Sequence, residues 1–286
     1  MADEAFVCIR KLNADQTAAN LLVELEKMFQ EKGIDATKIR FSGLDGTNTM
    51  SGIHKGLGRR ISHLAPHGKY CNCRNHRLAL CLVHRMRQFD DVDAIDKLLL
   101  ALWKTFKYST VKNAIFENAQ VAEEQPILRI LKVCVTRWLT HGQTAARVIG
   151  RYKSLVAALD TIYHVRSDCD AKGLRDELLN PSRVIMLLLL AEVLVPINNF
   201  CQFLQTKNLN YSLMMEKFSK VITKVENIQE KISSNDFESL KFFPQVENLL
   251  DFSRDRMVNG RNLRSSQTND GHSNTELLNN FMNRVG

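Results

Sequence analysis

The sequence of 286 residues lacks an apolar run long enough to cross a membrane. The longest run, 184–196, contains Glu192 and falls short of the roughly 20 residues that a transmembrane helix needs. A signal peptide is also missing, because an acidic start stands where a basic residue and an apolar core are expected. The seven cysteines are odd in number and scattered, which fits reduced thiols. We therefore expect a soluble intracellular protein with no membrane partner.

Several signatures of enzymes and cofactor sites are absent too. The stretch 56–60, Gly-Leu-Gly-Arg-Arg, lacks the third glycine and the preceding strand of a phosphate-cradling loop. No Ser-His-Asp or Cys-His arrangement for a nucleophile stands out. Cys71-x-Cys73-x-x-His76 offers residues that zinc binds, but a structural site usually has four ligands and Cys-x2-Cys spacing. Zinc is therefore not expected.

The composition indicates a folded, moderately basic protein. Hydrophobic residues make up 44% of the chain, which is ample for a core. The net charge is +8, from 39 basic and 31 acidic residues, which fits polyanion binding but also many ordinary proteins. Basic residues are densest in one region: Lys55, Arg59, Arg60, Arg74, Arg77, Arg85 and Arg87. On a folded surface they would form either a phosphate-binding stripe or an ordinary solvated face.

Periodicity divides the chain into two regions. The first 85 or so residues alternate between patterns of strands, at 7–10, 38–42 and 70–73, and patterns of helices, at about 18–32, 50–64 and 75–86. Helical patterns then follow at 92–107, 109–121, 142–163, 182–204 and 213–232, with one possible strand at 130–135. We expect an α/β lobe over 1–88, a mostly α-helical domain over 89–252 and a disordered tail over 253–286.

Four stretches in this order resemble the hAT family of DNA transposases, including its host-domesticated relatives. They are Gly43 to Gly52 around Asp45, the Cys-x-x-His stretch from Cys73 to Leu80, Thr136-Arg137-Trp138, and the amphipathic segment with Arg147 and Arg151. The resemblance covers roughly residues 5–235. It implies a partial RNase H-like lobe, a helical insertion-type domain, a helix-dominated fold overall and a nuclear location.

The resemblance also implies roles for individual residues. Asp45 stands at a vestigial catalytic metal-ligand position, and His76 lies near the former active site. Trp138 would stack on a DNA base and Arg137 would pair with a phosphate. Further DNA contacts would come from Lys55, Arg59, Arg60 and Arg77. Simpler roles remain open: Asp45 as a helix cap or Asx turn, His76 as a partly exposed residue at a helix start, and Trp138 with Arg137 in packing and a salt bridge.

The number of carboxylates that match the family's catalytic set decides whether catalysis is expected. Transposases of this type use two divalent metals, which need a cluster of oxygen ligands. Only Asp45 matches a position of the family's set; an upstream Asp and a downstream Glu are not recognisable. We expect a transposase-derived protein without independent catalysis and without a cofactor, which acts as a nucleic-acid-associated or protein-interaction module. Alternatives are an incomplete fragment of an active Mg²⁺-dependent transposase and a pure protein-interaction scaffold.

Overall fold

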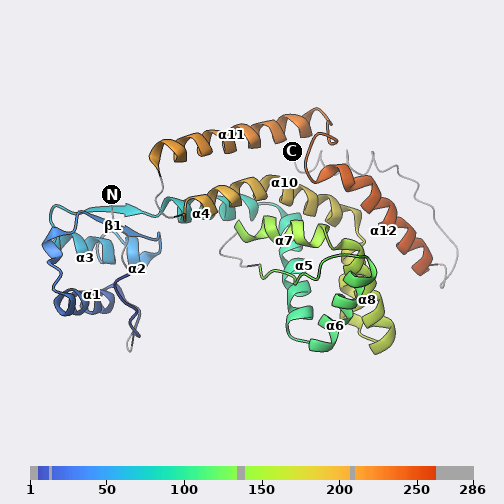
Figure 1. The fold of residues 1–286 in the computed structure, drawn as a ribbon, viewed down its shortest axis with the longest axis horizontal. Helices are drawn as coiled ribbons and strands as arrows, with labels where there is room; N and C mark the ends of the chain where they lie inside the picture. Colours follow the sequence, from blue (N-terminus) through green and yellow to red (C-terminus); the bar gives the residue numbers. More distant parts are fainter. Residues whose placement is uncertain (1–5, 13–14, 134–138, 207–209, 262–286) are drawn as a thin grey trace. The chain divides into compact units, whose positions relative to one another are not determined.

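A computed structural model describes residues 6–12, 15–133, 139–206 and 210–261 (Figure 1). Helices dominate the described chain, as expected from the sequence, and its two strands form one short parallel sheet. Contacts within the chain define two units, residues 1–78 and 79–286. The division falls inside helix α4 (Arg74–Met86), whereas the sequence pattern changes near residue 88.

The first unit is a small α/β arrangement. Its elements before α4 are α1 (Ala18–Lys32), the short 3₁₀ helix η1 (Ala36–Lys38), β1 (Phe41–Leu44), α2 (Asn48–Ser51), α3 (Leu57–Leu64) and β2 (Lys69–Asn72). Helix α1 begins where the Thr17 side chain accepts the N–H of Asn20 at 3.3 Å. It ends at Gly33, whose φ of 64° is left-handed, so the predicted glycine stop is confirmed.

The two strands run parallel, from Phe41 opposite Lys69 to Leu44 opposite Asn72. Alternate residues point to opposite faces, so Leu44 and Asn72 lie on the half-buried side and Phe41 on the other. Phe41 is 70% exposed. Ile39 precedes the strand and packs on the core of the unit. Strand β1 (Phe41–Leu44) therefore lies a few residues later than the strand predicted at 38–42.

Two further expectations for the first unit are corrected. Residues 7–10 are not a strand, and Ile9 is 87% exposed. Arg10 instead forms ion pairs with Glu24 and Glu31 of α1, so this segment is tied to a helix and not to the sheet. The predicted helix 50–64 is two helices, α2 and α3. Between them Gly56 approaches Gly52 so closely that a Cβ on Gly56 would lie 2.4 Å from the Gly52 nitrogen.

The core of the first unit lies between α1, α3 and the sheet. Its buried members are Ala18, Leu57 and Ile61, with Leu21, Leu22, Leu25, Ile39, Leu44 and Met50 packed around them. Gly58 of α3 lies under the ring of Tyr70, where a Cβ would be 2.7 Å from Tyr70 Cδ2. This close approach holds α3 against β2.

The second unit is helical. Its elements after α4 are α5 (Asp90–Lys107), α6 (Thr110–Ala122), α7 (Leu139–Ile149), α8 (Tyr152–Arg166), α9 (Cys169–Leu178), α10 (Pro181–Phe203), α11 (Tyr211–Ser233), the 3₁₀ helix η2 (Phe243–Gln245) and α12 (Val246–Arg261). The helices predicted at 92–107, 109–121, 182–204 and 213–232 are confirmed. The one predicted at 142–163 is broken after Ile149 into α7 and α8, and α9 and α12 were not predicted.

The remaining expectations for the second unit concern the strand predicted at 130–135 and the tail predicted at 253–286. Residues 130–133 are not a strand, and 134–138 lie outside the described part. Helix α12 continues to Arg261, with Ser253 buried, so ordered helix extends into the region expected to be a tail. Residues 262–286 are not described.

Helix α10 is the centre of the second unit. It is apolar on all sides, with Leu188 and Leu194 fully buried, as predicted for a core helix. By length and composition its 23 residues could cross a membrane, but 72% of its most apolar window is buried by the rest of the protein. Helix α7 lies alongside α10 (Figure 1), and Gly142 of α7 touches the α10 backbone, since a Cβ there would lie 2.9 Å from Val195 N.

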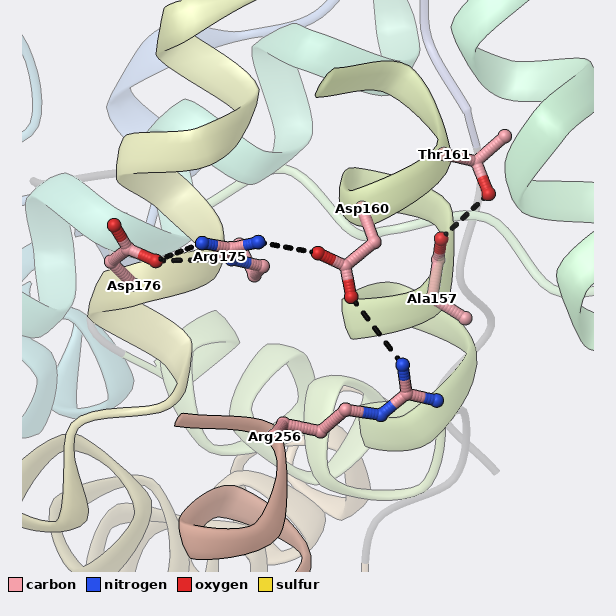
Figure 2. A network of polar contacts seen from close by, with 6 residues as sticks. All are labelled: Ala157, Asp160, Thr161, Arg175, Asp176 and Arg256. Carbon is pink, nitrogen blue, oxygen red and sulfur yellow. Dashed lines mark hydrogen bonds and ion pairs between the residues drawn. The ribbon is translucent and has the colours of Figure 1, made fainter. Parts of the chain in front are cut away.

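Ion pairs join the outer helices of this unit. Asp160 of α8 accepts from Arg175 of α9 at 2.6 Å and lies 3.6 Å from Arg256 of α12, and Arg175 also bonds Asp176 at 2.7 Å (Figure 2). The Arg175 and Asp160 side chains are only 16% and 20% exposed. The cations of this network are therefore neutralised by carboxylates within the fold.

Candidate nucleic-acid interface

Asp45 follows β1 directly, at the carboxyl end of the parallel strand pair. Its Oδ1 accepts the backbone N–H of Thr47 at 3.0 Å and the Thr47 hydroxyl at 2.6 Å. These hydrogen bonds, that of the hydroxyl first, hold the pKa of the Asp45 carboxyl below its usual value, and nearby His76 contributes in the same direction. The contacts are those of an Asx turn that leads into α2, the structural role left open by the sequence.

His76 lies in the first turn of α4 and is half-buried. The structure therefore brings Asp45 and His76 into one neighbourhood at the carboxyl edge of the sheet. Two residues of β2 join them there: the Tyr70 hydroxyl donates to Asn72 Oδ1, and burial raises the pKa of the Tyr70 phenol. This edge is polar and presents hydroxyl, amide and imidazole groups beside one carboxylate.

The edge does not fit a pair of catalytic metals. Across the described residues no three His, Cys, Asp or Glu side chains gather to hold a metal ion. Asp45 Oδ1 already accepts two hydrogen bonds, and a two-metal centre needs several converging carboxylates. Cys71 and Cys73 are exposed. No catalytic step can be derived from this set.

The basic residues that follow Asp45 in the sequence form a more distinctive feature. From Gly46 to Phe89 the sequence contains no Asp or Glu. The same 44 residues contain eight basic side chains, Lys55, Arg59, Arg60, Lys69, Arg74, Arg77, Arg85 and Arg87. Five of the eight histidines of the chain also lie there: His54, His63, His67, His76 and His84. We call residues 46–89 the acid-free segment.

The cations of the acid-free segment are open to solvent. Seven of the eight are exposed and Arg60 is half-buried, with its Nε donating to the Lys55 carbonyl at 3.0 Å. None of the eight forms an ion pair with a carboxylate of the described chain. Arg74, Arg77 and Arg85 share one face of α4, because three and eleven residues correspond to about one and three turns.

This arrangement places the expected contact residues as follows. Lys55 precedes α3, Arg59 and Arg60 lie on α3, and Arg77 lies on α4. Arg137 and Trp138 lie outside the described residues. Lys69, which the sequence pattern did not single out, points outward from β2. Lys69 could have been found from the absence of acidic residues over 46–89. A stretch in which every charged residue is basic matters more than the density of arginine alone.

Arg147 and Arg151, from the fourth stretch of the family resemblance, hold the connection between α6 and α7. Arg147 donates to the Arg129 carbonyl at 3.0 Å, and Arg151 to Gln120 Oε1 at 3.1 Å and the Pro126 carbonyl at 3.0 Å. All of these acceptors are neutral. Among the described residues, neither arginine therefore has a carboxylate to compensate its positive charge.

In comparisons with known proteins, no family model, no curated protein and no solved structure matches this chain.

Proposed function

We propose that the protein is a nucleic-acid-binding module that contacts phosphates through the acid-free segment and does not itself cleave the strand. The observation that carries this proposal is a run of 44 residues with eight cations, no acidic residue and no ion pair within the described chain. Folded proteins usually offset exposed cations with carboxylates, as the second unit does around Asp160. Cations without such partners are free to displace the counterions of a polyanion.

The resemblance to hAT transposases supports the choice of DNA as the polyanion and of the nucleus as the place. A derivative of such an enzyme would keep the strand-to-helix turn at Asp45 and the basic helix after it, in what remains of an RNase H-like lobe. With one carboxylate at the edge, the turn is structural. The rival hypothesis, a fragment of an active Mg²⁺-dependent transposase, predicts that a longer protein containing this chain and the missing carboxylates nicks duplex DNA when magnesium is added.

The test measures binding of the full chain to a labelled DNA duplex by fluorescence anisotropy, over a series of salt concentrations. One variant replaces Lys55, Arg59, Arg74 and Arg77 by glutamine. The control replaces four exposed lysines of the second unit by glutamine, Lys104, Lys107, Lys153 and Lys224, so both variants lose the same charge. A magnesium-dependent nicking assay on the unaltered chain accompanies them.

The slope of log affinity against log salt should become shallower by about 0.9 for each phosphate that the protein no longer neutralises, and only in the first variant. Equal weakening in both variants would mean that net charge alone drives association. The absence of any binding at low salt would rule out the proposal, and nicking would rule out its non-catalytic part.

A second candidate function, protein interaction, rests on α11. Tyr211, Met215, Phe218 and Ile222 recur at spacings of four, three and four, and each is more than 40% exposed. An apolar stripe of this kind on a helix fits docking of a protein partner. Pull-down with Phe218→Ser against Ser219→Ala as control would test it; equal capture by both variants would count against it.

A further inference from the structure

A groove of about 580 Å³ in the second unit collects three of its cations. Arg147, Arg151 and Lys241 line it, together with apolar side chains that include Leu128, Leu131 and Phe242. None of the described residues that line it is acidic. This groove is separate from the acid-free segment, because none of its lining residues lies within 46–89.

The guanidinium of Arg151 is fixed in place by neutral groups only. It donates to the Gly150 carbonyl at 2.7 Å, to the Pro126 carbonyl at 3.0 Å and to Gln120 Oε1 at 3.1 Å. Gln120 is fully buried and also accepts the N–H of Leu128 at 2.9 Å, so the whole arrangement is rigid. A guanidinium held this way keeps its charge without a counterion.

Arg147 stands beside Arg151 with the same kind of support, a hydrogen bond of 3.0 Å to the Arg129 carbonyl. Partial burial, and secondarily repulsion by Arg147, lower the pKa of Arg151. Two neighbouring guanidinium groups without a carboxylate partner are an electrostatic cost that an anion entering the groove would relieve. Paired arginines also offer the fork of N–H donors that suits phosphate oxygens.

Another part of the groove lining, Lys241 and Phe242, is held by a buried acid. Glu192 of α10 is only 3% exposed, and its two oxygens accept the backbone N–H groups of Lys241 at 3.0 Å and Phe242 at 2.7 Å. Both oxygens of this carboxylate are therefore engaged in hydrogen bonds that fix the backbone just before η2. Lys241 Nζ and the Phe242 ring are thereby presented together, 5.1 Å apart, at the groove.

From this geometry we propose that the groove is a second nucleic-acid site, which binds one unpaired nucleotide of a single strand. The phosphate lies between Arg147, Arg151 and Lys241, and the base packs on the apolar wall with Phe242. A duplex holds its bases inside the stack, so this wall is useful only for an unstacked base. The site rests on the proposed function insofar as both take nucleic acid, but it uses different residues and a different form of the ligand.

The experiment measures binding of the full chain to an oligothymidylate and to an abasic oligomer with the same number of phosphates. Arg147→Gln and Lys241→Gln should each lower affinity for both oligomers by about tenfold, because each removes a charged hydrogen-bond donor to phosphate. Phe242→Leu should lower affinity for the oligothymidylate by about threefold or more and leave the abasic oligomer unchanged. Lys104→Gln, an exposed lysine outside the groove, is the matched control.

Arg151 is left unaltered because its loss would also release residues 120–128, and urea unfolding verifies that each variant is folded. Affinity unchanged in Arg147→Gln and Lys241→Gln would overturn the site, as would equal effects of Phe242→Leu on both oligomers. A third arm uses a glutamate-rich peptide of matched charge. If the peptide binds more tightly than the oligomers and needs the same two cations, the groove is a site for acidic proteins and the proposal is wrong.

The two proposals fail separately. Loss of duplex binding on substitution of the acid-free segment, with no effect of the groove variants, leaves the proposed function standing without the second site. The reverse result leaves a single-strand site in the second unit and removes the acid-free segment from the interface.

Discussion

Replacement of Gly142 by alanine should destabilise the helical unit, although alanine is the better helix former. Gly142 lies in α7 where that helix meets α10, and a Cβ would sit 2.6 Å from Leu194 Cβ and 2.9 Å from Val195 N. Backbone atoms of a buried helix cannot move aside cheaply. Overpacking of this kind costs about 1–3 kcal/mol, whereas the gain in helix propensity is about 1 kcal/mol. A net loss of up to about 2 kcal/mol in the free energy of unfolding is expected.

The same substitution at Gly173 is the matched control. Gly173 lies on the exposed side of α9, and a Cβ there would meet no atom within 4 Å. Gly173→Ala should therefore raise the free energy of unfolding by about 0.5–1 kcal/mol. Urea unfolding followed by far-ultraviolet circular dichroism measures both. If Gly142→Ala is as stabilising as Gly173→Ala, the close approach of α7 and α10 is not a feature of the folded protein.

Three further substitutions test other parts of the structure. Glu192→Gln should lower the free energy of unfolding by about 2 kcal/mol, since it weakens two hydrogen bonds to a charged acceptor, whereas the exposed Glu226→Gln should change little in the same urea experiment. Gly33→Ala should cost about 1 kcal/mol, because alanine is strained at a φ of 64°; an unchanged unfolding midpoint would contradict the cap. Thr47→Ala should raise the pKa of Asp45 in an NMR titration. Because Thr47 lowers this pKa, the stability that it contributes is complete above about pH 4 and is lost as the pH falls through the folded-state pKa; an unchanged titration would refute the turn.

The helices were the most predictable part of the fold. The apolar spacing of α1 and the glycine after it lie within a single stretch of chain, so α1 could be placed with its end. Helix α10 was equally clear. The division of 142–163 into α7 and α8 was missed, although Gly150, a residue type that often ends helices, stands at the break.

The sequence predicted which residues belong to the candidate site but not which contacts they make. Asp45 and His76 were selected together and do lie at one edge of the sheet. The sequence left open whether Asp45 holds a metal or turns the chain. In the structure its carboxylate accepts a hydrogen bond from the Thr47 side chain. The groove around Arg147, Arg151 and Lys241 was not foreseen, since Lys241 is 90 residues away from Arg151 along the chain.

By itself the sequence determined where the long amphipathic and apolar helices form, where α1 stops and where the charge is of one sign, because these depend on neighbouring residues. Only the tertiary structure decided which segments pair and which charges are neutralised. Residues 7–10 have the composition of a strand but lie against α1 through Arg10, and Arg175 and Arg151 are both arginines near helix ends. One meets two carboxylates and the other meets only carbonyl and amide oxygens, because folding brings different distant segments to each.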